Sequence, residues 1–218
     1  MRLLKKNFLY IFFITYFIIG SLTSLNTGIS HDEFHEQENW KYNVSLTKNL
    51  IGHYLSDEKY DTKYDNYKDK YYGIGFQIIS QPIQYLLKNF IIKFKDISPY
   101  GATLVAKHFV TFSFFFISSF FIFMILRKIV ENSFFCYFTI IIYLTYPYLL
   151  GQALFSPKDI PFLSAWMICS YVSLNIFEKL LDFNTIKISN ILLLSICTGF
   201  LLSIRIAGVL IFFQYLIS

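Results

Sequence analysis

The stretch LVAKHFVTFSFFFISSFFIFMIL, residues 104–126, decides the fold class of this chain. It is apolar over a length that suffices to cross a bilayer core of roughly 30 Å. Arg127 and Lys128 follow it directly, and basic residues accumulate at the cytoplasmic ends of membrane spans. The run therefore predicts a transmembrane helix.

The composition extends this prediction to the whole chain. Of the 218 residues, 55% are hydrophobic, 21% are aromatic and only 15% are charged, which is too apolar for an ordinary soluble domain. The net charge of +5 does not indicate a nucleic-acid partner, because the excess lies in short connections, where membrane orientation requires it. The three cysteines lie inside apolar runs without metal-ligand spacing and are uninformative about redox compartment. We therefore predict an all-α, multi-pass transmembrane protein.

Apolar runs divide the chain into spans and one long loop. Residues 74–92 are apolar as well, but their three glutamines, proline and lysine favour a helix that lies in the interface or re-enters the membrane over one that spans it. The chain ends in an apolar run, so we expect it to be the N-terminal part of a larger transmembrane domain. The expected spans are residues 8–25, 104–126, 134–150, 161–177 and 188–215, and residues 26–103 are expected to form an outer loop containing interfacial helices.

Basic residues orient the predicted helices. Three of them precede the first span, as in an uncleaved signal anchor, and predict a cytoplasmic N-terminus. The basic connections 127–133 and 178–187 are then expected on the same side. Residues 26–103 and 151–160 are expected on the outer side of a bacterial inner (plasma) membrane.

Three polar features fall on this outer face. HDEFHE, residues 31–36, places three carboxylates and two imidazoles just after the first span, and SPKDIP, residues 156–161, forms a turn between two later spans. Arg205 lies about 25 Å along its helix at a rise of 1.5 Å per residue. A charged residue within a span costs at least roughly 2.5–3.5 kcal/mol, so it faces a cavity, a partner or headgroups. Taken singly, residues 31–36 are explained as a capped helix start, residues 156–161 as a solvated turn and Arg205 as an arginine that snorkels to the headgroups. Their convergence on one face favours a shared site.

Such a face is suited to transferring a sugar from a lipid phosphate. Asp32 is the candidate base that takes a proton from an acceptor hydroxyl as it attacks the anomeric carbon. Lys158 and Arg205 are the candidate ligands of the departing phosphate, whose negative charge grows in the transition state. Glu33 and Asp159 are candidates for holding the acceptor or a cation, and Asp159 also for holding Lys158.

These motifs resemble the GT-C superfamily, specifically the polyprenyl-phosphate-sugar-dependent transferases of the protein mannosyltransferase type (glycosyltransferase family 39-like). The resemblance rests on Asp32-Glu33, on FSPKDIPF at residues 155–162 and on IRIAG at residues 204–208. Ser156 departs from the asparagine that many bacterial relatives carry. The resemblance implies an inverting transfer with Asp32 as base, a lipid-linked sugar donor in place of a nucleotide sugar, and a protein, lipid or glycan acceptor.

Two other classes of function stay open. His31 and His35 have the spacing of the metal ligands in H-E-x-x-H proteases, but Glu33 comes one position late, which rotates it by about 100° from the place of the general base. We therefore expect His35 to contact substrate, although the carboxylates leave a divalent cation open as cofactor. A non-catalytic membrane scaffold or an inactive fragment is the second alternative.

Overall fold

The computed structural model describes residues 2–56, 66–69, 72–183 and 185–217, and all the regular elements in these residues are helices. The predicted all-α fold class is therefore confirmed for this part of the chain. The elements are α1 (Arg2–Asn26), α2 (His31–Ser56), α3 (Gly75–Phe94), α4 (Pro99–Ile129), α5 (Ser133–Thr145), α6 (Pro147–Ala153), α7 (Asp159–Leu181), α8 (Ile188–Ile204), the 3₁₀ helix η2 (Ile206–Leu210) and α9 (Ile211–Ile217).

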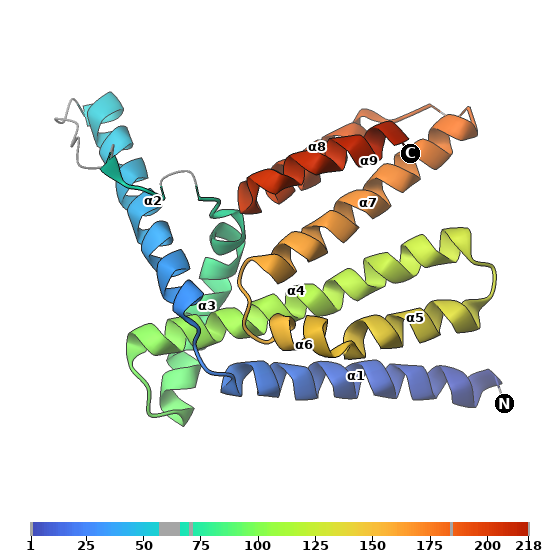
Figure 1. Ribbon diagram of the computed structural model, residues 1–218, viewed down its shortest axis with the longest axis horizontal. Coiled ribbons are helices and arrows are strands. Elements are labelled where there is room, and N and C mark those ends of the chain that lie inside the picture. The colour runs from blue at the N-terminus through green and yellow to red at the C-terminus, as the bar shows by residue number, and fades with distance from the viewer. Residues whose placement is uncertain (1, 57–65, 70–71, 184, 218) are drawn as a thin grey trace.

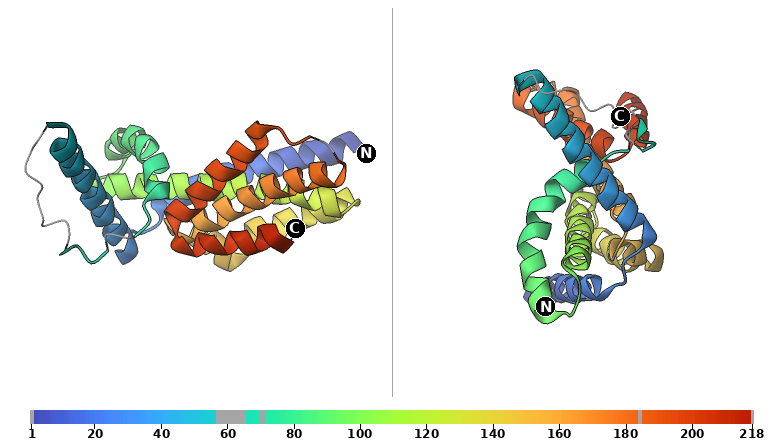
Figure 2. Two further views of the ribbon diagram at one scale, coloured as in Figure 1. Left: turned by 90° about the horizontal axis from the view of Figure 1, so that it is seen from above. Right: turned by 90° about the vertical axis from the view of Figure 1, so that its left-hand side faces the viewer.

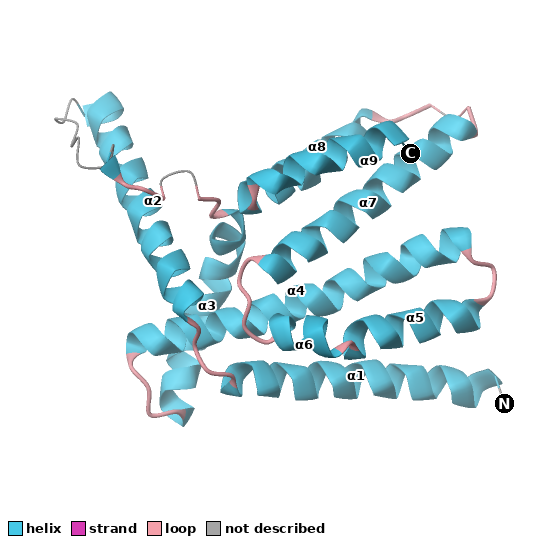
Figure 3. Ribbon diagram, in the orientation of Figure 1, coloured by secondary structure: helices cyan, strands magenta, loops and turns pink. Residues whose placement is uncertain are grey.

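The long apolar helices lie side by side, and α2 and α3 lie across one end of the resulting bundle (Figures 1 and 2). The central helix is α4, which packs against α1, α3, α5 and α7. Short loops join most of these helices (Figure 3). We call the end that carries α2, the loop before α7 and the turn after α8 the polar end. The N-terminus and the α4–α5 and α7–α8 connections lie at the opposite end.

Three helices, α1, α4 and α7, are long and apolar enough to cross a membrane. The pair α5 and α6 passes the same test when taken together, with a bend of 59° between its halves. The bend falls at Tyr146 and Pro147, where proline begins the second helix and cannot donate a backbone hydrogen bond to the first. The chain therefore has three candidate spans, or four if the bent pair counts as one, and it is a membrane protein by length and composition.

The predicted fifth span, residues 188–215, is wrong. Helix α8 ends after 17 residues at Ile204, and Arg205 has an extended backbone. The chain then turns back along α8, so that the hydroxyl groups of Thr198 and Tyr215 lie 2.8 Å apart. The turn is close because Gly208 approaches Leu201, where an added Cβ would lie 3.1 Å from the leucine Cγ. Arg205 breaks the helix at the polar end, where its charge finds a partner.

Local sequence signals explain where the helices at the polar end begin. The backbone N–H of Ser30 donates to the carboxylate of Glu33 over 2.7 Å, which is half of a capping box at the start of α2. Ser98 accepts a hydrogen bond from the backbone N–H of Gly101, and Pro99 occupies the first position of α4. Both are standard N-terminal arrangements. These caps determine that α2 begins at His31 and α4 at Pro99.

Helix α3 has its polar face inside and its apolar face outside. Gln77, Ser80 and Gln84 are buried, and they form a ladder in which Gln84 donates to Ser80 and Gln77 donates to Gln84. This arrangement inverts that of a soluble amphipathic helix, which indicates that apolar solvent surrounds the helix and that a polar region lies beneath it. The exposed large apolar residues of α3 are Ile78, Ile79, Ile83, Tyr85, Leu86, Phe90, Ile92 and Phe94.

The contact between α1 and α4 depends on one glycine. An added Cβ on Gly20 would lie 2.0 Å from the ring of Phe112, which is fully buried. Tyr16 and Phe17 on α1 stack around the same phenylalanine. Small residues at helix interfaces in membranes let two backbones approach closely.

Replacing this glycine tests the α1–α4 contact. Gly20→Ala is expected to lower the free energy of unfolding by about 1–3 kcal/mol, because the buried ring of Phe112 has to shift. The measurement is an unfolding titration with a denaturing detergent in mixed micelles. Gly199→Ala in α8 is the matched control, since no atom lies within 4 Å of its added Cβ, and it is expected to be neutral or slightly stabilising. Equal destabilisation by both variants would contradict the close approach.

Candidate functional site

The polar end collects ionisable side chains from four parts of the chain. The first turns of α2 supply carboxylates, and α4 supplies Lys107 and His108. The start of α7 and the loop before it supply Asp159 and Lys158, and the turn after α8 supplies Arg205. Six residues were predicted to form a site, and each of them lies at this end: Asp32, Glu33, His35, Lys158, Asp159 and Arg205.

Lys158 lies between a carboxylate and an aromatic ring. Its Nζ donates to Oε1 of Glu36 over 3.1 Å and lies 2.8 Å from the ring centroid of Tyr72. The residue is buried. Burial lowers the pKa of the Lys158 ammonium from its ordinary value, and the neighbouring Glu36 opposes that shift. The carboxylate and the ring therefore keep a cation at a buried position.

Arg205 and Asp159 form a second ion pair that stays accessible. The Nη2 of Arg205 lies 2.6 Å from Oδ1 of Asp159, with 38% and 56% of the two side chains exposed. Ser156 donates from its hydroxyl to the other carboxylate oxygen over 3.3 Å. Because a guanidinium carries five N–H donors, this pairing leaves Arg205 able to bind an anion as well. Of the two cations Lys158 and Arg205, Arg205 is therefore the one that remains accessible to a ligand.

These contacts correct one predicted pairing. Asp159 was expected to hold Lys158 or the acceptor, but its carboxylate lies against Arg205, and Lys158 pairs with Glu36 instead. The reason is geometric, because Asp159 begins α7 and projects to the surface, whereas Lys158 is buried below the first turns of α2.

Glu33 and His108 form a buried pair. The Nε2 of His108 lies 2.6 Å from Oε2 of Glu33, and its Nδ1 lies 3.1 Å from the backbone carbonyl of Ser24. A carbonyl only accepts, so Nδ1 carries a proton. The contact between Nε2 and the carboxylate then also requires a proton, which makes the pair neutral as a whole. With its other oxygen on the backbone N–H of Ser30, Glu33 is held between the start of its own helix and His108 of α4, which in turn contacts α1 through Ser24.

Asp32 and His35 lie on the exposed side of α2. His35 contacts Asp69 through Nε2 at 3.3 Å, and its ring meets the ring of Tyr72 edge-on, with centroids 5.8 Å apart. Asp32 has no such partner among the contacts of the described residues, but its charge acts on Tyr72. An exposed carboxylate beside a polar surface is free to meet a substrate.

Tyr72 lies where the acidic and basic halves of the cluster meet. Burial raises the pKa of the Tyr72 phenol above its ordinary value, and the charges of Glu36 and Asp32 raise it further, whereas Arg205 opposes the shift. These interactions place both carboxylates and the guanidinium near one phenol. Sequence reasoning missed Tyr72, because it closes a tyrosine-rich polar tract in which nothing distinguishes it from its neighbours.

Two glycines determine where Tyr72 lies. An added Cβ on Gly73 would lie 2.4 Å from the backbone oxygen of Ser203, and one on Gly75 would lie 1.8 Å from the hydroxyl oxygen of the same serine. The chain after Tyr72 therefore packs directly against the end of α8. Since Arg205 follows that end immediately, this close approach brings the ring and the guanidinium together.

Lys107 is the least expected member of the cluster. It is 1% exposed, and its Nζ has no hydrogen-bond partner among the described residues. Its electrostatic neighbours are Glu36, Glu33 and Lys158. The sequence alone could have indicated Lys107, because Lys107 and His108 are adjacent ionisable residues within an apolar run, and ionisable residues in such a run indicate a functional position. It was overlooked because the run was judged by its overall hydropathy.

Comparisons of this chain with protein-family models, with curated proteins and with solved structures give no match. The candidate site therefore rests on its own residues.

The described residues contain no group of three or more His, Cys, Asp and Glu side chains arranged to hold a metal ion. The histidines of HDEFHE illustrate this, since His35 turns to Asp69 and both His31 and His35 are exposed. Among the described residues, the polar end therefore shows no three-residue ligand set of the kind that the zinc protease alternative needs.

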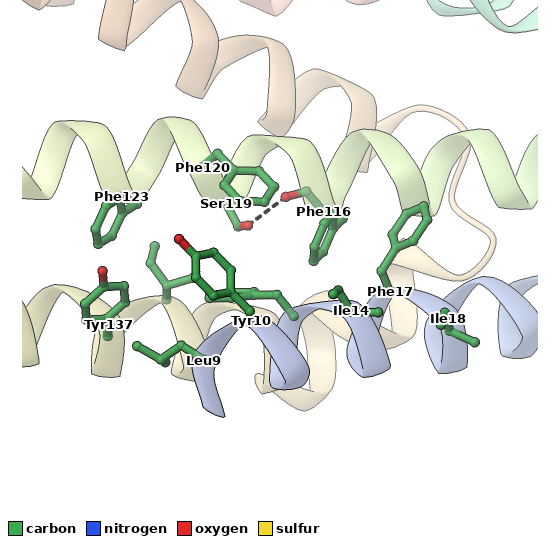
Figure 4. A pocket seen from close by; sticks show the side chains of 12 residues that line it. Leu9, Tyr10, Ile14, Phe17, Ile18, Phe116, Ser119, Phe120, Phe123 and Tyr137 are labelled. Atoms are coloured by element: carbon green, nitrogen blue, oxygen red, sulfur yellow. Dashed lines mark hydrogen bonds between the residues drawn. The ribbon is translucent and has the colours of Figure 1, made fainter. Parts of the chain in front are cut away.

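A separate apolar pocket of about 480 Å³ lies between α1, α4 and α5 (Figure 4). Among its twelve lining residues, Ser119 donates its hydroxyl to the backbone carbonyl of Phe116 over 2.6 Å. Two tyrosines, Tyr10 and Tyr137, supply the other polar groups. The side chains that line this pocket carry no charge, in contrast to those at the polar end.

The Glu36–Lys158 pair can be tested through its coupling. Glu36→Gln is expected to lower the free energy of unfolding by about 3–5 kcal/mol, because it leaves a buried ammonium without its carboxylate. The double variant Glu36→Gln/Lys158→Met is expected to recover much of that loss. Detergent unfolding titrations measure both. Glu38→Gln, which breaks the exposed pair with Lys41, is the control and should cost less than about 1 kcal/mol. Additive losses in the double variant would contradict the pairing.

Proposed function

We propose that this chain transfers a sugar from a polyprenyl-phosphate carrier to an acceptor at the outer face of a membrane, with inversion at the anomeric carbon. In this proposal it is a protein-mannosyltransferase-like member of the GT-C superfamily. The membrane is the bacterial inner membrane, the N-terminus is cytoplasmic and the polar end faces the periplasm. The acceptor is a protein, a lipid or a glycan.

The observation that carries the proposal is the accessible Arg205–Asp159 pair at the end of a membrane bundle. A carrier phosphate lies at the level of the lipid headgroups, and a guanidinium binds phosphate through paired N–H donors. Arg205 is half-exposed and keeps donors free beyond its contact with Asp159. An exposed carboxylate, Asp32, lies in the same cluster. Phosphate binding and proton removal, which this transfer needs, therefore have candidate groups side by side.

The reaction is written as one displacement. An acceptor hydroxyl oxygen attacks the anomeric carbon while Asp32 takes the hydroxyl proton. The bond between that carbon and the phosphate oxygen breaks, and the electron pair leaves with polyprenyl phosphate. Arg205 stabilises the charge that grows on the leaving phosphate. The new glycosidic bond forms on the opposite face of the sugar, which inverts the configuration.

Lys158 has an indirect part in this proposal. Its ammonium is buried and already contacts Glu36 and Tyr72, so the phosphate meets Arg205 first. Lys158 adds positive electrostatic potential beneath the site, and its contacts with Glu36 and Tyr72 keep these two side chains in place. Glu33, which is buried against His108, positions the start of α2 and thereby Asp32.

The position of α3 supports a lipid-linked substrate. With isoleucine, leucine and phenylalanine outside and glutamine inside, α3 lies in the outer leaflet in this proposal, as an interfacial helix of the loop 26–103. Interfacial helices bury an apolar face at the boundary of headgroups and acyl chains. A carrier in the same leaflet then reaches the polar end without leaving the membrane.

A non-catalytic scaffold is favoured by one observation. The two buried acidic residues already have partners, Glu33 with His108 and Glu36 with Lys158, as they would in a purely structural polar core. The unsatisfied Nζ of Lys107 argues against it, because buried donors in a finished core are normally hydrogen-bonded. The two experiments that follow separate these functions.

Arg205→Gln tests phosphate binding. It is expected to weaken the affinity for polyprenyl phosphate by about ten- to hundredfold, since a hydrogen bond to a charged group contributes about 1.5–3 kcal/mol. Binding is measured on the purified full chain in nanodiscs. The control is Arg127→Gln, because Arg127 is exposed at the opposite end of the bundle. Equal affinity in Arg205→Gln and the unmodified chain would refute the assignment of the phosphate ligand.

Asp32→Asn tests the base. It is expected to reduce transfer by about 10²- to 10⁴-fold, the usual contribution of a general base, and to leave carrier binding unchanged. The assay follows radiolabelled sugar from a polyprenyl-phosphate hexose into the acceptor fraction. Glu38→Gln, another exposed carboxylate on α2, is the control and should retain full transfer. Unchanged turnover in Asp32→Asn would favour the scaffold.

A further inference from the structure

We propose that Tyr72 is the platform on which the sugar of the lipid-linked donor lies. This inference rests on the proposed function and adds a residue and a ligand contact to it: the ring of Tyr72 binds the apolar face of a pyranose whose phosphate is held by Arg205.

The ring of Tyr72 is held in place by the cation beneath it. One face of Tyr72 covers the ammonium of Lys158, with 2.8 Å between Nζ and the ring centroid. Tyr72 is itself 41% exposed, whereas Lys158 beneath it is 8% exposed. The ring is therefore part of the surface of the site and the cation is its support. A cation–π contact of this kind keeps an aromatic side chain in one orientation.

Charged and polar groups surround the ring of Tyr72. Asp32, Glu36 and Arg205 all act electrostatically on the phenol of Tyr72, and the imidazole of His35 lies at its edge. A pyranose combines an apolar C–H face with a rim of hydroxyls. An aromatic surface bordered by carboxylates, a guanidinium and an imidazole matches both parts, because the ring supplies apolar area and the rim supplies hydrogen-bond partners.

The ring of Tyr72 also lies beside the residue that is proposed to bind the phosphate. In a carrier-linked sugar the anomeric carbon is bonded to a phosphate oxygen, so the sugar has to lie beside the group that binds the phosphate. Gly73 and Gly75 pack against the end of α8, which places Tyr72 next to Arg205. The same close approach makes the platform rigid, as a site that orients a reacting carbon requires.

The experiment compares two lipids in nanodiscs with the full chain. One is a polyprenyl phosphate carrying a single hexose, and the other is the same polyprenyl phosphate without sugar. Tyr72→Ala is expected to bind the hexose-linked lipid about tenfold more weakly, the loss of one aromatic contact, and to bind the bare lipid as the unmodified chain does. Tyr72→Phe, which keeps the ring, is expected to bind both lipids normally.

The control is Tyr148→Ala, since Tyr148 is an exposed tyrosine on α6 and should affect neither lipid. An equal loss for both lipids in Tyr72→Ala would overturn the platform and make Tyr72 a structural support of Lys158. Unchanged binding of both lipids in Tyr72→Ala would overturn it as well, while leaving the proposed function in place. Failure of the unmodified chain to bind either lipid would instead overturn the proposed function and, with it, this inference.

Discussion

The ion pair between Lys158 and Glu36 is the contact on which the polar end depends. Removing one partner of a buried ion pair is strongly destabilising, and the partner of Lys158 comes from a helix 122 positions earlier in the chain. The pair joins α2 to the loop that precedes α7. Beside it, Tyr72 covers the same ammonium and His108 holds Glu33. Segments that lie far apart in the sequence therefore meet around these buried charges.

Helix α2 depends strongly on the buried ion pairs at the polar end. Beyond its first turns it projects away from the bundle (Figures 1 and 2), and among the described residues its buried side chains are polar: Glu33, Glu36, Gln37 and Asn39. Stacking of Phe34 on Tyr100 adds an aromatic contact between α2 and α4. The buried contacts of the first turns of α2 are electrostatic, and they hold the exposed carboxylate of Asp32 at the polar end.

The opposite polarity of α3 is the one that an apolar environment favours. In water a helix with buried glutamines and exposed phenylalanines would be unstable, since burial of apolar surface is the main favourable term in folding. Next to lipid this penalty disappears, and the glutamines bond to one another instead of to water. The polar and apolar faces of α3 thus both find suitable surroundings, one inside the protein and the other outside it.

Some of this structure could be predicted from the sequence. Hydropathy is a local property that accumulates along a run, so the all-α class and the candidate spans in α1, α4 and α7 were accessible without coordinates. The break at Arg205 was accessible in part, because a charge in an apolar run has to end near a polar surface. The reversal of the chain after it was not, because it depends on the packing of Gly208 against Leu201.

The gathering of these residue types at the polar end follows from their charges, which the apolar bundle excludes. Which of them pair depends on the fold. Lys158 takes Glu36, Asp159 takes Arg205, and Tyr72 enters the cluster because two glycines let its backbone lie against α8. Pairing is a matter of distance between segments, and neither residue type nor spacing along the chain contains that distance.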